Sequence, residues 1–290
     1  HRLHVFEVGG VGGLTVDPHQ FLGLEINPRA AAIAELVLWI GYLQWHHRTH
    51  GDVQPPEPVI KDFKNIECRD AVLAYDSMRI VLDKDTLKPV TRWDGRTFKK
   101  HTVTGEDVPD ESARTPLYEY TNPRLAEWPE VDFVVGNPPF IGNKRMRTYL
   151  GDGYVDALRT AHVDVASTCD YVMYWWNLAA TKITNSNLRQ FGFVTTNSIT
   201  QILNRSIVHA NTTVSSPDTI VFAIPDHPWV DSTDGAAVRI AMTVVTAILK
   251  RGTLYIVRQE YETNSDEIGV ELEARHGLIN PNLTVGVDVH

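Results

Sequence analysis

The tetrapeptide Asn137-Pro138-Pro139-Phe140 combines residue types that suit chemistry at an amino group. It directly follows the apolar run 131–135, whose β-branched and aromatic residues predict a buried strand. Consecutive prolines fix two φ angles and remove two N–H donors, so the turn presents carbonyl oxygens beside the Asn137 amide. Ligands of open α/β sheets bind just beyond the carboxyl ends of the strands. The pattern predicts a stiff site that accepts hydrogen bonds from an –NH2 group.

Such a site could make an unreactive amino group nucleophilic. An amino group on a heteroaromatic ring or an amide is a poor nucleophile, because its lone pair is delocalised. The Asn137 side-chain oxygen and the Pro138 carbonyl would accept both N–H bonds and favour a pyramidal nitrogen, while Phe140 would stack on the ring, a contact of about 1–3 kcal/mol per base. Catalysis would then be positioning and electrostatics, without a covalent intermediate. The alternative is that Asn-Pro-Pro is only a loop turn.

The elements around this turn alternate between strand and helix, which predicts an α/β fold with a doubly wound, mostly parallel, Rossmann-like sheet. Asn27 and Pro28 are typical of a helix start, and the Ala- and Leu-rich run 29–45 predicts a helix packed on the sheet. A second helix is expected at 170–183, with Tyr174-Trp175-Trp176 as core residues. Strands are expected at 21–26, within 59–72, and at 131–135, 191–195, 219–224, 239–249 and 253–257.

A polar segment interrupts this alternation. Between about 74 and 128, Pro, Thr, Lys and Asp dominate, which indicates an insertion between the third and fourth strands, with Trp93-Asp94-Gly95-Arg96 as a hairpin tip. We expect residues 1–258 to form the main domain. Residues 259–290 are expected to be a linker or the start of a C-terminal target-recognition region.

Composition excludes several classes of protein. The apolar fraction of 43% is too high for a disordered chain, and a net charge of −9 limits nucleic-acid contacts to local basic patches. The longest apolar run, 30–45, is shorter than the roughly 20 residues of a membrane span. Cys68 and Cys169 lack metal or disulfide spacing, so we expect a cytoplasmic protein without a metal site.

Five blocks of sequence resemble the methyltransferase domain of MmeI-like enzymes, a family of adenine-N6 DNA methyltransferases. They are GLEINPRAAAIAELVLWIGYLQWHHR (23–48), VDFVVGNPPFIGNKRMR (131–147), DYVMYWWNLAA (170–180), FGFVTTNSITQ (191–201) and FAIPDHPWVDSTDGAAVRIAMT (222–243). The resemblance implies the class I fold of methyltransferases that use S-adenosylmethionine as cofactor. It also implies double-stranded DNA as partner, a flipped adenine as substrate, and a place in a larger polypeptide of a bacterial restriction–modification system.

The resemblance assigns roles to individual residues. Asn137, Pro138, Pro139 and Phe140 match the catalytic tetrapeptide. Glu25 matches the acid that holds the cofactor ribose hydroxyls, and Asp70 with Ala71 matches the position that pairs with the cofactor adenine. Both acids precede Asn137, and only 67 residues separate it from Asp70, which resembles the gamma order with target recognition placed C-terminally.

The family's first glycine-rich motif is not found. The run Val8–Gly13 is glycine-rich, but only 12 residues separate Gly13 from Glu25, too few for a helix and a return to the second strand. We therefore expect the domain to be N-terminally incomplete, with this motif upstream of His1.

Four further residues are candidate DNA contacts. Lys144, Arg145 and Arg147 follow the tetrapeptide and suit phosphate groups, and Asn197 follows the strand 191–195 at the same predicted sheet edge. The alternative for the basic residues is a solvated helix start.

Two other functions stay open at this point. The same Asn-Pro-Pro-aromatic turn serves methyltransferases that act on protein glutamine or on guanine N2 of ribosomal RNA. A chain without the first motif could also be an inactive truncated or split fragment that only binds DNA.

Overall fold

The computed structural model describes residues 18–51, 53, 64–185, 187–212, 218–229, 238–262 and 268–286. The chain divides into two compact units. The first contains residues 1–71 and 126–129, and the second contains residues 72–125 and 130–290. The glycine-rich run at 8–13 lies outside the described residues.

The first unit is built around one long helix. Its elements are η1 (Pro18–Gln20), β1 (Gly23–Glu25), α1 (Pro28–His50) and β2 (Ile66–Cys68). The predicted start of α1 is confirmed: the Asn27 side chain accepts the N–H groups of Arg29 and Ala30, and Pro28 occupies the first turn. The helix continues five residues beyond the predicted end. β1 and β2 pair in parallel, and β1 is half-buried rather than buried on both faces.

Among the described residues of the second unit, six strands form one mixed sheet in the order β11-β12-β14-β13-β15-β16. Their bounds are β11 (Phe133–Gly136), β12 (Gln190–Thr196), β13 (Thr219–Trp229), β14 (Val238–Thr246), β15 (Gly252–Glu262) and β16 (Ile268–Gly277). β11–β12 and β13–β15 pair in parallel, whereas β12–β14, β13–β14 and β15–β16 are antiparallel. The α/β class is confirmed, and the mostly parallel Rossmann-like sheet is not.

Connection lengths explain this difference. A parallel crossover needs a dozen or more residues, but only eight residues join β13 to β14 and five join β15 to β16. Antiparallel hairpins are the connections that such short segments allow. β16 falls within 259–290, the range expected to be a linker or the start of a recognition region, and α5 (Ile202–Asn211) was not predicted.

β11 lies at the edge of the sheet, and it is less buried than the sequence predicted. Phe133 and Val135 are 54% and 86% exposed. The alternate residues Val134 and Gly136 are half-buried. An edge strand has a neighbour on only one side, so part of its surface stays uncovered.

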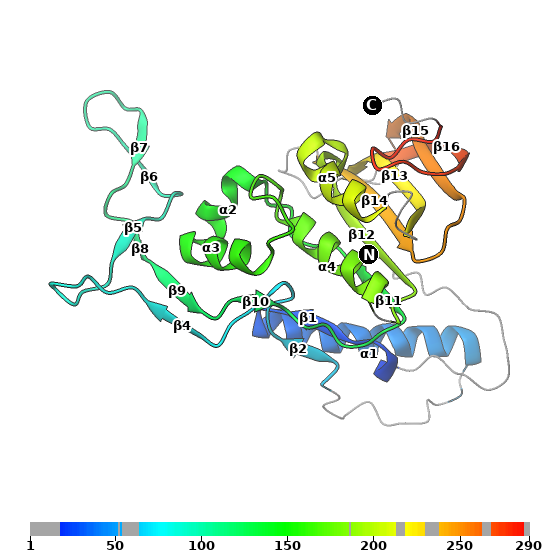
Figure 1. The fold of residues 1–290 in the computed structure, drawn as a ribbon, viewed down its shortest axis with the longest axis horizontal. Helices are drawn as coiled ribbons and strands as arrows, with labels where there is room; N and C mark the ends of the chain where they lie inside the picture. The colour runs from blue at the N-terminus through cyan, green and yellow to red at the C-terminus, as the bar shows by residue number, and fades with distance from the viewer. Residues whose placement is uncertain are drawn as a thin grey trace. The chain divides into compact units, whose positions relative to one another are not determined.

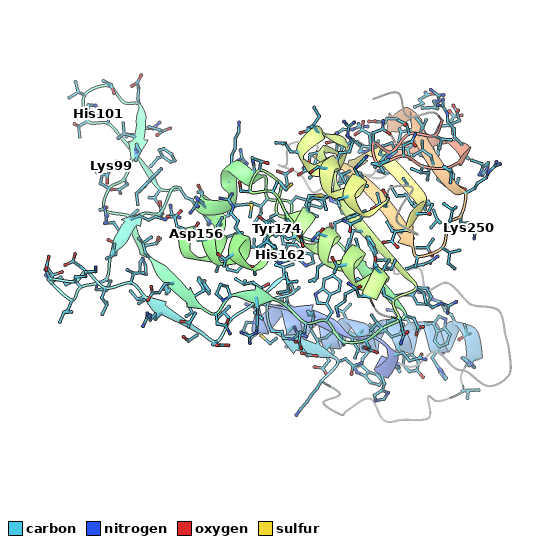
Figure 2. All side chains as sticks on the ribbon, viewed as in Figure 1. Lys99, His101, Asp156, His162, Tyr174 and Lys250 are labelled. Atoms are coloured by element: carbon cyan, nitrogen blue, oxygen red, sulfur yellow. The ribbon has the colours of Figure 1, made fainter. Side chains whose placement is uncertain are left out.

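The helices of the second unit supply the core against this sheet. They are α2 (Asn143–Leu150), α3 (Asp152–Ala161), α4 (Val172–Asn185) and α5, with the short η2 (Asn197–Thr200) after β12. Tyr174 and Trp176 are fully buried, as predicted for the core, and Trp176 meets Phe191 edge to face at 5.2 Å. Figure 2 shows His162 and Tyr174 beside one another, with ring centroids 5.1 Å apart. No helix of the described residues has both the length and the apolar character to cross a membrane.

The predicted polar insertion is a nested antiparallel ribbon (Figure 1). Its outgoing strands pair in turn with its returning strands, β3 with β10, β4 with β9, β5 with β8 and β6 with β7. The bounds are β3 (Leu73–Ala74), β4 (Ser77–Ile80), β5 (Thr91–Trp93), β6 (Phe98–Lys100), β7 (Asp107–Pro109), β8 (Arg114–Pro116), β9 (Tyr118–Thr121) and β10 (Arg124–Leu125).

The predicted hairpin tip at 93–96 is wrong. β5 and β6 flank this segment but do not pair with each other, and the tip lies between β6 and β7 at 101–106. Instead, the Asp94 carboxylate accepts the backbone N–H groups of Arg96 and Thr97 and bends the strand. An Asx turn and a hairpin tip share the Asp-Gly signal, which is why the sequence pattern did not separate them.

Several contacts attach the ribbon to α2 and α3, among them the ion pair of Arg92 with Asp152 at 3.0 Å. The Arg96 guanidinium donates to the carbonyls of Thr148 and Tyr149 at the end of α2, a favourable place for a cation. A Cβ built on Gly153 would lie 1.7 Å from the Tyr118 carbonyl oxygen, so the approach of α3 to β9 requires glycine. Lys99 and His101 lie on the ribbon, far from Asp156 of α3 (Figure 2).

Candidate active site

The parallel pairing of β11 with β12 places the predicted catalytic turn and Asn197 at one edge of the sheet. Gly136, the last residue of β11, is opposite Phe193, and β12 ends three residues later at Thr196. Asn137 therefore begins one loop and Asn197 the next, both at the carboxyl ends of neighbouring parallel strands. This is the position where α/β sheets bind ligands.

The tetrapeptide presents polar groups to solvent and packs one proline inward. Asn137 and Pro139 are exposed, Phe140 is half-buried, and Pro138 is buried. Within the described part of the chain, the Asn137 amide and the Pro138 carbonyl make no hydrogen bond. The exposed Asn137 amide therefore has no partner among the described residues, and the use of the Pro138 carbonyl as a ligand acceptor stays a prediction.

The strand that leads into this turn is closely packed against its neighbour. A Cβ on Gly136 would lie 3.1 Å from the Phe193 ring, tighter than most real contacts. The small residue lets the turn leave β11 directly beside β12. Asn137 thus starts from a fixed point of the sheet.

The loop after the tetrapeptide is also fixed. The Ile141 N–H donates to the Pro139 carbonyl at 3.1 Å, and the Ile141 carbonyl accepts the Tyr171 N–H at 2.9 Å. The Asn143 N–H, at the first turn of α2, donates to the Asp170 carboxylate at 2.9 Å. Asp170 was not among the predicted site residues, because a contact across 27 residues leaves no local pattern.

The predicted cofactor acids lie together in the first unit. Glu25 ends β1 opposite Cys68, the last residue of the parallel strand β2, and Asp70 follows two residues later. Both acids are half-buried, and one Glu25 oxygen accepts the Asn27 N–H at 2.8 Å. The Ala71 carbonyl accepts the Trp128 indole N–H at 2.6 Å. Pairing thus brings the two acids to one edge of this small sheet.

The predicted DNA contacts on α2 differ in whether acidic residues of the protein pair with their charges. Lys144 and Arg145 are exposed on α2 and form no ion pair with any described residue. Arg147 instead contacts Asp156 at 2.6 Å and Asp152 at 3.1 Å, and the hydrogen bonds that it donates to these carboxylates raise its pKa. Its charge is already offset within the protein, and it joins α2 to α3.

Asn197 is likewise engaged in an internal contact. It is half-buried and donates to Asp226 at 3.2 Å, and Asp226 is in turn paired with Arg239 at 2.7 Å. The hydrogen bonds that Arg239 donates to Asp226 and Glu260 raise the pKa of Arg239. Among the described residues there is no group of three or more His, Cys, Asp or Glu side chains suited to a metal ion.

The model of the family described as "MmeI, DNA-methyltransferase domain" matches residues 5–256. A solved structure, the type IIL restriction-modification enzyme MmeI in complex with DNA, is 28% identical over 55% of this chain, with a TM-score of 0.41. The match covers 20% of that chain, so this protein spans a small part of its length. No curated protein matches.

The family match extends from before β1 to within β15, and it includes the tetrapeptide, both acids and α2. It therefore covers well over half of the sequence. The chain belongs to the family of MmeI DNA-methyltransferase domains.

Proposed function

We propose that the protein transfers a methyl group from S-adenosylmethionine to the N6 nitrogen of adenine in double-stranded DNA. One observation carries the proposal: Asn137–Phe140 follows a strand at the carboxyl edge of the sheet, and the Asn137 amide is exposed and has no partner among the described residues. Family membership supports DNA as the substrate class. The resemblance of five sequence blocks to MmeI-like enzymes supports a role within a larger restriction–modification polypeptide.

The chain's own groups would act on the amino nitrogen. The Asn137 oxygen and the Pro138 carbonyl would accept its two N–H bonds, which draws the lone pair out of conjugation. The adenine would be flipped out of the duplex to reach them, and Phe140 would stack on its ring. Because both prolines restrict the backbone, these acceptors are oriented before the base arrives, and little reorganisation is needed during the reaction.

The first unit fits the cofactor in the chemistry of its donors. Glu25 offers a half-buried carboxylate at a strand end, suited to the two hydroxyls of a ribose, and Asp70 offers an acceptor for an adenine amino group. S-adenosylmethionine would supply an activated methyl group on its sulfonium sulfur. Glu25 and Asp70 would hold its nucleoside end.

Lys144 and Arg145 are proposed as the phosphate contacts of this domain. They are exposed on the helix that directly follows the catalytic loop. In a protein with a net charge of −9, cations that pair with no described residue favour local contact with the DNA backbone at this position. We propose Asn197 as a weaker contact, reached when its bond to Asp226 is exchanged for one to DNA.

The test is mass analysis of nucleosides after incubation of the full-length protein with methyl-labelled S-adenosylmethionine and plasmid DNA. We expect label in N6-methyladenine. The Asn137→Ala variant should lower the turnover number by at least about 100-fold, the scale of losing one preorganised polar group at a reacting centre. Its affinity for DNA should stay nearly unchanged.

The matched control is Asn185→Ala, which removes an exposed amide at the last residue of α4. It should keep full activity. Unchanged turnover in Asn137→Ala would refute the assigned role. Label in protein glutamine or in guanine of ribosomal RNA would refute the substrate, and absence of both label and cofactor binding in titration calorimetry would indicate an inactive fragment.

A further inference from the structure

The carboxylate of Asp170 joins three segments that are distant in sequence. One oxygen accepts the backbone N–H of Asn143 at 2.9 Å. The other accepts the Ser198 hydroxyl and the Asn204 amide, each at 2.8 Å. Asp170 therefore connects the first turn of α2, which follows the catalytic loop, with η2 and α5, which follow β12.

Asn204 both donates a hydrogen bond to Asp170 and accepts one from it. Its side chain is buried, its oxygen accepts the Asp170 N–H at 2.9 Å, and its nitrogen also reaches the Ser198 carbonyl at 3.1 Å. The amide thus donates to the carboxylate and accepts from the backbone of the same residue. Such two-way bonding fixes both side chains in one orientation.

The backbone around Asp170 adds two further bonds to the catalytic loop. The Tyr171 N–H donates to the Ile141 carbonyl at 2.9 Å, and the Asn143 side chain donates to the Thr168 carbonyl at 2.8 Å. Together with the Asn143 N–H, these bonds attach 141–143 to 168–171 at three points. The loop is therefore fixed to the chain just before α4.

The contacts with 168–171 restrict the parts of the catalytic loop that the prolines leave free. Pro138 and Pro139 fix φ at two positions but leave the ψ angles and the following residues free. β11 holds the start of the loop, and the contacts with 168–171 hold its end. Hydrogen bonds to a carboxylate are stronger than those between neutral groups, so Asp170 is the strongest single contact in the set.

We propose that Asp170 is the positioning residue that sets the catalytic loop 137–143 against the loop 197–201. The inference rests on the proposed methyl transfer, in which both loops would border the flipped base. Asp170 does not act on the substrate itself, because three donors already engage its two oxygens and it is only partly exposed.

The test is Asp170→Asn in the full-length protein. The side-chain oxygen still accepts the Asn143 N–H, but an –NH2 group then faces the Asn204 –NH2 group, and two donors oppose each other. We expect the turnover number for methyl transfer to plasmid DNA to fall on the order of 10- to 100-fold, as for a small misplacement of a catalytic group. The dissociation constants for S-adenosylmethionine and for the DNA should not change.

A second variant and a control accompany it. Ser198→Ala removes one of the three donors to Asp170, together with the hydroxyl's contacts with Thr196 and Asn204, and should give an intermediate loss of turnover. Asp83→Asn makes the same chemical change in a turn of the insertion, where the Asp83 carboxylate accepts the Thr86 N–H at 2.8 Å, and should keep wild-type turnover.

Hydrogen exchange measured by mass spectrometry provides a readout that does not depend on activity. In Asp170→Asn the amides of 141–143 should exchange faster, while those of β13 and β14 keep their protection. Wild-type turnover and wild-type exchange in folded Asp170→Asn would overturn the proposal. Loss of protection throughout the unit would also overturn it, because Asp170 would then be a general stability residue.

The two proposals fail in different ways. If the wild-type protein does not methylate DNA, the proposed function fails, and exchange at 141–143 still decides whether Asp170 fixes the loop. If the wild type methylates DNA and Asp170→Asn does so equally well, only the positioning role fails.

Discussion

The buried carboxyl group of Asp218 should lower the free energy of unfolding as pH rises. The residue precedes β13, is 3% exposed, and accepts a hydrogen bond from the Thr184 hydroxyl at 3.3 Å. Burial raises the pKa of its carboxyl group from 3.8 to about 6, because the charged form loses hydration that this bond restores only in part. The native state thus holds its proton more tightly than the unfolded chain does.

The sign follows from proton linkage. Between pH 3.8 and 6 the folded state binds more protons at this site than the unfolded state, so the free energy of unfolding falls as pH rises. At about 1.4 kcal/mol for each pKa unit, the full difference is about 3 kcal/mol. The stabilisation is present below pH 3.8 and is lost as pH passes through about 6.

The Asp218→Asn variant cannot ionise and removes this dependence. Urea unfolding followed by tryptophan fluorescence, at a series of pH values from 4.5 to 8, should show the variant gaining stability relative to wild type until about pH 7 and then levelling. Taking the difference between the two proteins cancels all other titrating groups. A difference that stays constant with pH would refute the reasoning. Asp83→Asn should show almost no change over this range, because the hydrogen bond from the Thr86 backbone lowers the pKa of the Asp83 carboxyl group, and its effect on stability is lost only below pH 3.8.

Two further predictions concern the insertion and the DNA contacts. Gly153→Ala should lower the free energy of unfolding by about 1–3 kcal/mol or more, as overpacking does, because its Cβ would overlap the Tyr118 carbonyl. Gly41→Ala, in the middle of α1 with no atom near the added Cβ, should raise it by about 0.5–1 kcal/mol, and thermal unfolding of both variants checks the contrast. Lys144→Ala or Arg145→Ala should each reduce the slope of log binding constant against log salt by about 1, whereas Arg147→Ala should leave the slope unchanged and weaken the contact of α2 with α3. The slopes are measured by fluorescence anisotropy with labelled DNA. A reduced slope in Arg147→Ala would contradict the interpretation that Asp152 and Asp156 already offset the Arg147 charge.

Local signals in the sequence predicted the elements that position the turn. Asn27 and Pro28 define the start of α1, and the apolar runs 131–135 and 191–195 correspond to β11 and β12. The insertion at 74–128 corresponds to the ribbon β3–β10. Each of these depends on residues within a few positions of one another, so periodicity and capping chemistry suffice to find them.

Pairing between strands was harder to predict. The runs 219–224 and 239–249 read as two more parallel strands, but the short connection between β13 and β14 requires an antiparallel hairpin. β13 also extends to Trp229, through two prolines at 225 and 228 that broke the expected pattern. The irregularity in its pairing with β14 between Ile224 and His227 contains the proline at 225, whereas the proline at 228 pairs in register with Arg239. Prolines are compatible with a strand at such bulges.

The candidate site shows the same division between local and long-range information. Asn137–Phe140 could be found because the prolines and the strand before them are adjacent in sequence. Asp170, Ser198 and Asn204 could not, because each is an ordinary polar residue whose partner lies up to 34 residues away. A rigid active loop needs both kinds of information: prolines limit its conformations, and a carboxylate from elsewhere selects one of them. The most damaging changes near this site outside the tetrapeptide are therefore expected at residues that never touch the substrate.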